Sequence, residues 1–258
     1  MSTLQGQTAF VTGGGTGIGR AIAEDLGKAG VTVIVCGRRT GPLEETVAAV
    51  TAAGGAASAV RCDLTDPEAI ERCAEGLLAQ HGAIDILINN AGFSSKIRST
   101  RYIGAQEWRD VMDVNTMGPV VLTKALLPAM IERGRGDVVM ISSMAAINPS
   151  IMAGAAYSAA KVAARAYMNV LAQEMRPHGI RCMTIFPGEV DTPILDNRAL
   201  PPDAETRARM MLPQDISDAV MMVVRLPRRA WVSELAIAAT DPRDMTKDVA
   251  AAKAKQSI

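Results

Sequence analysis

The sequence predicts one α/β domain, built on a doubly wound parallel β-sheet of about seven strands with helices on both faces. Three observations predict this fold class. Short runs that are apolar throughout, as expected of strands buried on both faces, recur along the chain. Longer runs with helical character alternate with them, and a glycine-rich segment separates the first strand from the first helix. The length of 258 residues is sufficient for a single domain with a three-layer core.

The first elements can be justified one by one. Residues 9–12 form a short apolar run that we interpret as a buried strand, and the helix expected over 17–28 is ended by Gly30. A second apolar run, 31–36, completes a βαβ unit. The same alternation then continues, with strands expected at 58–62, 84–89, 137–141, 181–186 and 235–238, and helices at 41–53, 67–81, 105–132, 155–176 and 214–224.

Three segments lie outside this alternation. Residues 93–103 and 190–212 are irregular, and long loops in a compact domain are usually functional lids or disordered connectors. We therefore assign residues 1–240 to the domain and expect 190–213 to act as a substrate loop. The polar, Ala/Lys-rich tail 241–258 is expected to be loosely held or packed on a neighbouring subunit.

The glycine-rich segment predicts a dinucleotide site. Glycine permits a tight turn and a close approach of the backbone to a pyrophosphate, which then lies at a helix N-terminus with its free N–H groups. Alone, such a loop would indicate only a tight turn, but here a strand precedes it and a helix follows. Its glycines are Gly13, Gly14, Gly15, Gly17 and Gly19.

Tyr157 is the only one of the three tyrosines with a lysine four residues after it, Lys161. Good helix formers surround the pair, and positions i and i+4 share one face of a helix. A phenol with a pKa near 10 is a poor base at neutral pH, and an ammonium beside it favours the phenolate. The pair can therefore act as a general acid/base, although an isolated YxxxK pair is more often a surface tyrosine with a solvated lysine.

Composition excludes several classes of function. Lys+Arg and Asp+Glu balance at 27 each and aromatic residues make up 3%, so we expect no nucleic-acid partner. With two histidines and no Cys/His cluster, we expect no metal site. The four cysteines show no CxxC pairing, no basic-then-apolar signal begins the chain, and no apolar run approaches 18 residues. We therefore expect a cytoplasmic protein with reduced thiols and no membrane association.

Several motifs, in order and at ordinary spacing, resemble the short-chain dehydrogenase/reductase family over nearly the whole chain. TGGGTGIG is similar to its cofactor loop, CDLTD to its adenine-contacting segment, NNAG to its structural motif, and FPGEVDTP to the segment that holds the nicotinamide carboxamide. The resemblance implies a Rossmann-type fold and an enzyme that acts on alcohols or carbonyls. It implies cofactor binding by Gly13, Gly15, Thr16, Gly17, Ile18, Gly19, Arg38, Arg39, Asp63, Leu64, Asn90, Ala91, Gly92, Tyr157, Lys161, Pro187, Gly188, Val190 and Thr192.

The resemblance also implies a catalytic tetrad. Tyr157 would exchange the proton with the substrate oxygen, Lys161 would lower the tyrosine pKa and hold the nicotinamide ribose, and Ser143 would hydrogen-bond the substrate oxygen. Asn115 would anchor a water that links Lys161 to solvent. Ser143 lies 14 residues before Tyr157, where family members commonly show 13, so we interpret the loop as one residue longer and keep Ser142 as the alternative.

The expected cofactor is NADP rather than NAD. Family members that select NAD carry an acidic residue at the end of the second strand, where this chain has Gly37 followed by Arg38 and Arg39. An arginine can pair bidentately with a 2′-phosphate. Against this, Thr16 stands where many NADP-preferring members have a basic residue, and the two arginines are also compatible with a solvated helix start.

Two observations bear on the substrate. The irregular loops carry basic residues that would favour an anionic substrate, or would simply be solvated: Lys96, Arg98 and Arg101, then Arg198, Arg207 and Arg209, the last three offset by acids. The C-terminal third resembles a subgroup of NADP-dependent hydroxy-acid and serine dehydrogenases, so a small 3-hydroxy acid is the leading expectation. An apolar ketone or aldehyde remains the alternative, because Met144, Ile147, Ile151, Met152, Met210 and Met211 could line an apolar pocket.

Two further expectations follow. A cofactor-sensing binding protein that has lost catalysis would show damage at one of the four catalytic positions, and none is visible. By resemblance, the long helices near 105–132 and 155–176 should pair between subunits, which predicts a homotetramer, with a dimer as the alternative.

Overall fold

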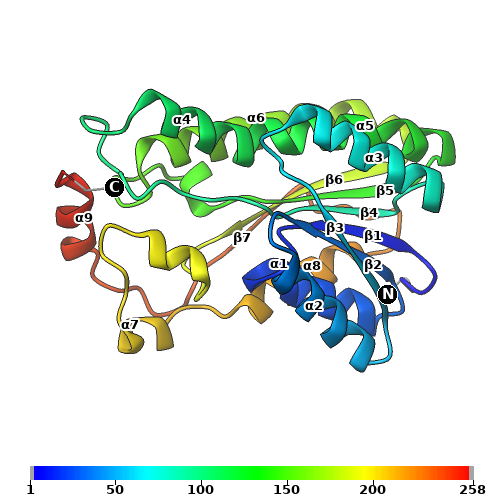
Figure 1. The fold of residues 1–258 in the computed structure, drawn as a ribbon, viewed down its shortest axis with the longest axis horizontal. Helices are drawn as coiled ribbons and strands as arrows, with labels where there is room; N and C mark the ends of the chain where they lie inside the picture. The colour runs from blue at the N-terminus through cyan, green and yellow to red at the C-terminus, as the bar shows by residue number, and fades with distance from the viewer. Residues whose placement is uncertain (1–2, 256–258) are drawn as a thin grey trace.

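The computed structural model describes residues 3–255 and contains one seven-stranded sheet in the order β3-β2-β1-β4-β5-β6-β7 (Figure 1). All six strand pairings are parallel; β1 pairs with β2 from Thr8↔Thr32 to Thr12↔Cys36. The strands are β1 (Thr8–Thr12), β2 (Thr32–Gly37), β3 (Ala56–Arg61), β4 (Ile86–Asn89), β5 (Gly136–Ile141), β6 (Ile180–Pro187) and β7 (Glu234–Ile237). The predicted fold class is confirmed, and each predicted strand lies within two residues of an observed one.

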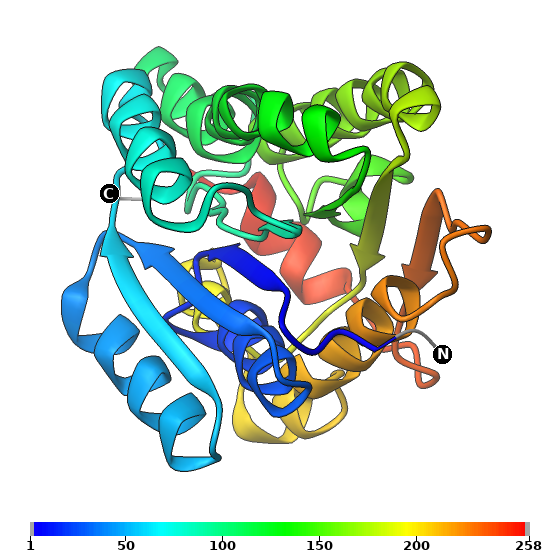
Figure 2. The same ribbon diagram turned by 90° about the vertical axis from the view of Figure 1, so that its right-hand side faces the viewer.

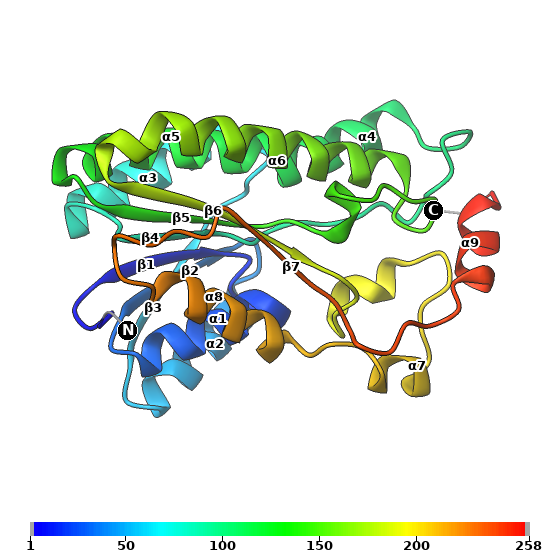
Figure 3. The ribbon, with the colours of Figure 1, turned by 180° about the vertical axis from the view of Figure 1, so that it is seen from behind.

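Helices cover both faces of the sheet, and the end-on view shows the three layers (Figure 2). Helices α3, α5 and α6 lie on one face, and α1, α2 and α8 lie on the other (Figures 1 and 3). Their bounds are α1 (Gly17–Lys28), α2 (Thr40–Ala52), α3 (Pro67–His81), α4 (Ala105–Met112), α5 (Gly118–Arg133), α6 (Ala155–Met175), α7 (Ala204–Ala208), α8 (Pro213–Val224) and α9 (Thr246–Lys253).

The sheet has a hydrophobic core on each side because successive strand side chains point to opposite faces. In β1, Ala9 and Val11 belong to the core beneath α1 and α8, whereas Phe10 belongs to the core beneath α3, α5 and α6. In β2, Val33 and Ile34 divide in the same way. Strands buried on both faces are thus the reason for the continuous apolar runs in the sequence.

The expected long helix at 105–132 is interrupted in the structure. A π-helical turn, Asp113–Met117, separates α4 from α5. By length and composition alone the whole run Ala105–Arg133 could cross a membrane, but buried core helices pass the same test. Here α5 packs on α3 and β5, so its apolar residues are explained by the core.

The C-terminal tail differs from expectation. Residues 246–253 form α9, and the segment before it is fixed to its own chain through Arg243, which binds both Glu189 and Asp248 at 2.7–2.9 Å. Helices α9 and α7 both lie at the same end of the molecule (Figures 1 and 3). The short helix α7 and a 3-10 turn at Pro193–Asn197 likewise give structure to the loop expected over 190–213.

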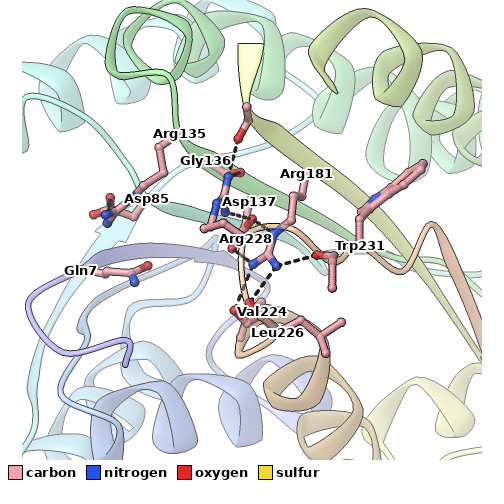
Figure 4. Close-up of polar contacts among 12 residues, drawn as sticks. Gln7, Asp85, Arg135, Gly136, Asp137, Arg181, Val224, Leu226, Arg228 and Trp231 are labelled. Carbon is pink, nitrogen blue, oxygen red and sulfur yellow. Dashed lines mark hydrogen bonds and ion pairs between the residues drawn. The ribbon is translucent and has the colours of Figure 1, made fainter. Parts of the chain in front are cut away.

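The amino ends of the central strands are joined by a buried ion pair (Figure 4). Arg181 in β6 donates to Asp137 in β5 through two bonds of 2.7 and 2.8 Å, and both side chains are almost fully buried. Arg228 adds a third bond to Asp137 at 2.7 Å, and Arg181 also donates to the backbone carbonyl of Val224. This cluster ties α8 and the segment after it to the sheet, at the end away from the carboxyl ends of the strands.

Candidate active site

A cavity of about 1220 Å³ lies along the carboxyl ends of the strands, where parallel α/β sheets place their ligands. Its lining comes from the segments that follow β1 to β6, so residues far apart in the sequence meet there. The predicted site residues that line it are Gly13, Gly15, Thr16, Ile18, Arg38, Arg39, Asp63, Leu64, Asn90, Ala91, Gly92, Ser143, Tyr157, Lys161, Pro187, Gly188, Val190 and Thr192.

Gly17, Gly19 and Asn115 are not among the described residues that line the cavity, but each shapes it. Gly17 has φ of 54°, a left-handed conformation that favours glycine. A Cβ at position 19 would lie only 2.3 Å from the carbonyl oxygen of Gly13. The first turn of α1 can therefore approach the loop only because glycine stands at position 19.

The segment after β4 holds the glycine loop in place. The Thr12 hydroxyl accepts hydrogen bonds of 3.0 Å from the backbone N–H groups of both Asn90 and Ala91. The Asn90 side chain donates to the carbonyls of Thr12 (2.9 Å) and Gly13 (3.3 Å). Asn90 thus positions the loop, in addition to lining the cavity.

Tyr157 lies in the first turn of α6 and lines the cavity together with Ser143, from the segment after β5. Burial raises the pKa of Tyr157, while a hydrogen bond with Ser143 and the positive charges of Arg98 and Arg198 act in the opposite direction. The Ser143 hydroxyl accepts from the backbone N–H of Ala145 at 3.1 Å, which leaves its proton free for Tyr157. The net effect of these surroundings is a raised pKa of Tyr157, which Ser143 and the two arginines moderate.

Ser143, not Ser142, is the serine beside Tyr157. The hydroxyl oxygen of Ser142 is buried and has no hydrogen-bond partner among the described residues. Both serines line the cavity, and the hydrogen bond with Tyr157 comes from Ser143, as the longer loop would require.

Lys161 is buried one turn beyond Tyr157, with its Nζ 5.5 Å from the centroid of the tyrosine ring. The Nζ donates to the carbonyl of Ile141 at 3.2 Å. Burial lowers the pKa of Lys161 to about 8. Loss and gain of its proton near neutral pH are consequently accessible.

Asn115 is held by the π-helical turn directly behind Lys161. Its side-chain nitrogen donates to the carbonyls of Phe93 and Val111, both at 2.8 Å, whereas its buried Oδ1 has no partner among the described residues. A Cβ at Gly92 would lie 2.7 Å from that oxygen and 3.4 Å from the Lys161 Nζ. Glycine at position 92 thus keeps open the space between the asparagine and the lysine.

The basic residues of the two loops behave differently from one another. Arg98 is buried and lines the cavity, whereas Lys96 and Arg101, in the same loop, are exposed and do not. Of the second loop, Arg198 lines the cavity and is paired with Glu189 at 2.5 Å. Arg207 is paired with Asp191 and Asp196, and Arg209 with Asp241, so neither adds an uncompensated charge to the mouth.

Of the six apolar residues considered for a substrate pocket, two line the cavity and four do not. Met144 and Met152 line the cavity. Met210 and Met211 are buried, and Ile147 and Ile151 are 41% and 47% exposed; none of these four lines it.

Sequence reasoning missed the contribution of the tail. Met245 and Val249, from the segment leading into α9 and from α9 itself, line the cavity. Glu189 also lines it and binds Arg198 on one side and Arg243 on the other. No signal in the sequence pairs Glu189 with Arg243, because the two lie far apart along the chain.

Comparisons with known proteins agree with this geometry. A family model described as short chain dehydrogenase matches residues 7–202. The chain is 37% identical over 234 residues to dehydrogenase/reductase SDR family member 7B of Rattus norvegicus, covering 84% of this chain and 71% of the relative.

Two solved structures illustrate the likeness of the fold. A metagenomic short-chain oxidoreductase in complex with NADP is 35% identical, with a TM-score of 0.80 over 92% of this chain and 98% of that one. The closed form of serine dehydrogenase complexed with NADP⁺ is 29% identical, with a TM-score of 0.81 over 90% of this chain and 94% of that one. Since the family model spans most of the chain and the fold and the motifs agree with it, this protein belongs to the short-chain dehydrogenase family and is an oxidoreductase.

Proposed function

We propose that the protein interconverts a secondary alcohol and a carbonyl with NADP(H), using Tyr157 as the general acid/base. The observation that carries the proposal is the grouping of Tyr157, Ser143 and Lys161 in the cavity that also contains the glycine loop. Tyr157 supplies a group that can transfer a proton, Ser143 a hydroxyl that can bind the substrate oxygen, and Lys161 a cation, all in the same cavity.

The residues of the cavity fit a dinucleotide. The loop ahead of α1 leads into a helix N-terminus that no side chain caps, and Gly19 lets this first turn pack against the loop, so that the helix N-terminus faces the position of a pyrophosphate. Asp63 and Leu64 would contact the adenine, and Pro187, Gly188, Val190 and Thr192 the nicotinamide end. When bound, the nicotinamide accepts or delivers the hydride.

Proton transfer is assigned to this chain's own residues. In the direction of oxidation, the Tyr157 phenolate takes the proton of the substrate hydroxyl, and Ser143 donates a hydrogen bond to the same oxygen. Lys161, with its pKa near 8, is suited to pass the proton onward. The unpartnered Oδ1 of Asn115 supports a water at this point, so that Asn115 links Lys161 to solvent.

The preference for NADP over NAD rests on the end of β2. Gly37 supplies no carboxylate to repel a 2′-phosphate, and Arg38 and Arg39 both line the cavity. Relatives of known structure that contain NADP support the same choice.

A small 3-hydroxy acid is the substrate that we propose. Buried Arg98 in the cavity and the 29% identity to a serine dehydrogenase support it. Met144 and Met152 favour the second candidate, an apolar ketone or aldehyde. A catalytically silent sensor is disfavoured because all four catalytic positions carry the expected residues.

We also propose that residues 1–240 form the catalytic unit with 190–213 as its substrate loop, that the enzyme is a homotetramer rather than a dimer, and that it is cytoplasmic. Four free thiols support the reduced compartment.

The test is reduction of NADP⁺, with NAD⁺ in parallel, across 3-hydroxy acids, amino alcohols and apolar secondary alcohols. Turnover should fall by about 10³-fold or more in Tyr157→Phe, while NADPH affinity measured by fluorescence titration stays close to that of the wild type. Turnover that survives this substitution would remove Tyr157 from the mechanism. Tight NADPH binding without turnover on any of the alcohols would favour the sensor.

A further inference from the structure

Arg98 is a buried arginine that forms no ion pair with a carboxylate among the described residues. Its side chain is 6% exposed. One terminal nitrogen donates to the carbonyl of Ala153 at 2.8 Å and the other to the hydroxyl of Ser94 at 2.9 Å, and both acceptors are uncharged. Its Nε is buried and has no hydrogen-bond partner among the described residues. Each terminal nitrogen also carries a second N–H, so the guanidinium retains donors beyond those that the described residues use.

Arg181 provides the internal comparison. It is buried to a similar extent, but two bonds to Asp137 compensate its charge (Figure 4). The one carboxylate that influences the pKa of Arg98 is that of Glu107, which acts through its charge and forms no ion pair with the arginine; one of its oxygens is hydrogen-bonded to the hydroxyl of Ser95, and its buried Oε2 has no partner among the described residues. A buried charge without an ion-pair partner is costly, so its presence in a ligand cavity indicates that a ligand supplies the partner.

Arg98 is held close to the reacting group. A Cβ at Gly154, the residue that caps the start of α6, would lie 3.0 Å from the Arg98 Cδ, and φ of 82° at Gly154 favours glycine. The start of α6 is thus pressed against the arginine, one turn before Tyr157. The positive charge of Arg98 is also one of the influences that oppose burial at Tyr157.

Arg198, the other arginine whose charge acts on Tyr157, is less suitable as an anion site. It is paired with Glu189, which Arg243 binds from the other side. The charge of Arg198 is therefore compensated by an ion pair, whereas Arg98 has no ion pair among the described residues.

We propose that Arg98 binds the carboxylate of the substrate while the hydroxyl of that substrate lies at Tyr157 and Ser143. This inference rests on the proposed function. It restricts the substrates of that function to acids whose hydroxyl lies near the carboxylate. A planar guanidinium with unused donors pairs with a carboxylate through parallel hydrogen bonds, so Arg98 determines specificity for the acid over neutral alcohols of the same shape.

The test compares 3-hydroxybutanoate with its uncharged counterpart, 3-hydroxybutanamide. In Arg98→Met, the ratio of kcat/KM for the acid to kcat/KM for the amide should fall on the order of 10²-fold. The ratio is the useful quantity because any effect of Arg98 on the pKa of Tyr157 acts on both compounds alike. Lys96→Met is the matched control, since it removes an exposed positive charge from the same loop, and its ratio should stay within about twofold of the wild type.

A binding measurement separates this inference from the proposed function. The complex with NADPH and 3-hydroxybutanoate cannot react, because both partners are reduced, so calorimetry reports affinity without turnover. Arg98-dependent binding of the acid in an enzyme that oxidises no alcohol would retain the anion site and reject the proposed reaction. Oxidation of neutral alcohols with no preference of the NADPH complex for the acid over the amide would retain the reaction and reject the anion site.

Arg98→Lys is a second variant in case Arg98→Met does not fold. It keeps the charge and most of the side chain but lacks the planar guanidinium that binds a carboxylate through two hydrogen bonds. Its ratio should fall about tenfold. If folded Arg98→Met or Arg98→Lys keeps the wild-type ratio, or if Lys96→Met lowers the ratio as much as they do, the proposal is wrong.

Discussion

Ser143 and Tyr157 interact side chain to side chain, although they come from the end of β5 and the start of α6. Burial raises the pKa of Tyr157, and the hydrogen bond from Ser143 opposes that rise. The Ser143 oxygen also accepts from the N–H of Ala145, so its own proton remains available for the tyrosine. The serine can thus support the phenolate before any substrate binds.

Ser143→Ala is therefore expected to raise the pKa of Tyr157 and to remove a donor to the substrate oxygen. Oxidation at pH 7 should slow on the order of 10²-fold, and the acidic limb of the pH profile of kcat/KM should move to higher pH. Ser142→Ala is the matched control, because the Ser142 hydroxyl lines the same cavity but has no hydrogen-bond partner among the described residues. Equal losses in the two variants would contradict the assignment of Ser143.

Replacing Arg38 and Arg39 together by serine should weaken NADPH binding by about 10- to 100-fold, because the 2′-phosphate loses its charged partners. NADH lacks this phosphate, so its affinity should change little. Fluorescence titration with each cofactor gives the two dissociation constants. An equal loss for both cofactors would exclude contact with the 2′-phosphate.

Lys161 should make the free energy of unfolding depend on pH in a predictable direction. Burial lowers its pKa from 10.5 in the unfolded chain to about 8 in the native state. Between those values the unfolded state binds more protons, so stability should rise with pH, by about 3 kcal/mol in total. Urea unfolding of the wild type and Lys161→Met at pH 7.5 and 10.5 isolates this difference. If the difference in unfolding free energy between the wild type and Lys161→Met is the same at both pH values, the pKa of the lysine is not lowered by folding.

The ion pair between Arg181 and Asp137 predicts a stability effect without a kinetic one. Arg181→Met leaves a buried carboxylate with one remaining partner, Arg228, and should cost about 3–5 kcal/mol of unfolding free energy. Arg72→Met, which removes an arginine 65% exposed, should cost less than about 0.5 kcal/mol. At a temperature where both variants are folded, KM for NADP⁺ should be unchanged, since the ion pair lies at the opposite end of the strands. A higher KM in Arg181→Met alone would contradict this separation.

The proposed homotetramer places α6 at a subunit interface. Val170, on α6, is 54% exposed in the single chain, and a glutamate there should split the assembly into smaller species measured by light scattering. Met222→Glu, on α8 across the sheet, introduces the same charge at a position 44% exposed and should leave the mass unchanged. A wild-type protein that scatters as a monomer would reject the tetramer.

The regular elements could be predicted because local signals specify them. Apolar runs predicted most of the strands, although the edge strand β3 is largely exposed, and helix signals predicted α1 and α3 to the residue. Helix α9 was not predicted, because its composition is that of a solvated tail. Its position is fixed by ion pairs of Arg243 with Asp248 in the helix and with Glu189, which is distant in the sequence. The π-helical turn at Asp113–Met117 was not predicted, because it lies inside a continuous helical pattern. It differs from an α-helix only in its backbone hydrogen bonding.

In the loop 93–103, too, the sequence identified the residues but not their surroundings. Arg98, Lys96 and Arg101 look alike in the sequence, as basic residues on one irregular segment. Folding buries the first against Gly154 and leaves the other two in solvent. Charge alone could not distinguish them, because burial depends on which distant segment packs on each residue.

By itself, the sequence determined the fold class, the glycine loop, the Tyr157–Lys161 pair and the positions of the proposed tetrad, because each depends on residue type at short spacing. Only the tertiary structure decided that Ser143 is hydrogen-bonded to Tyr157, that Arg98 is buried with no ion pair within residues 3–255, and that α9 lines the cavity. These are contacts between segments 14 or more residues apart, and their geometry is set by the packing of helices on the sheet.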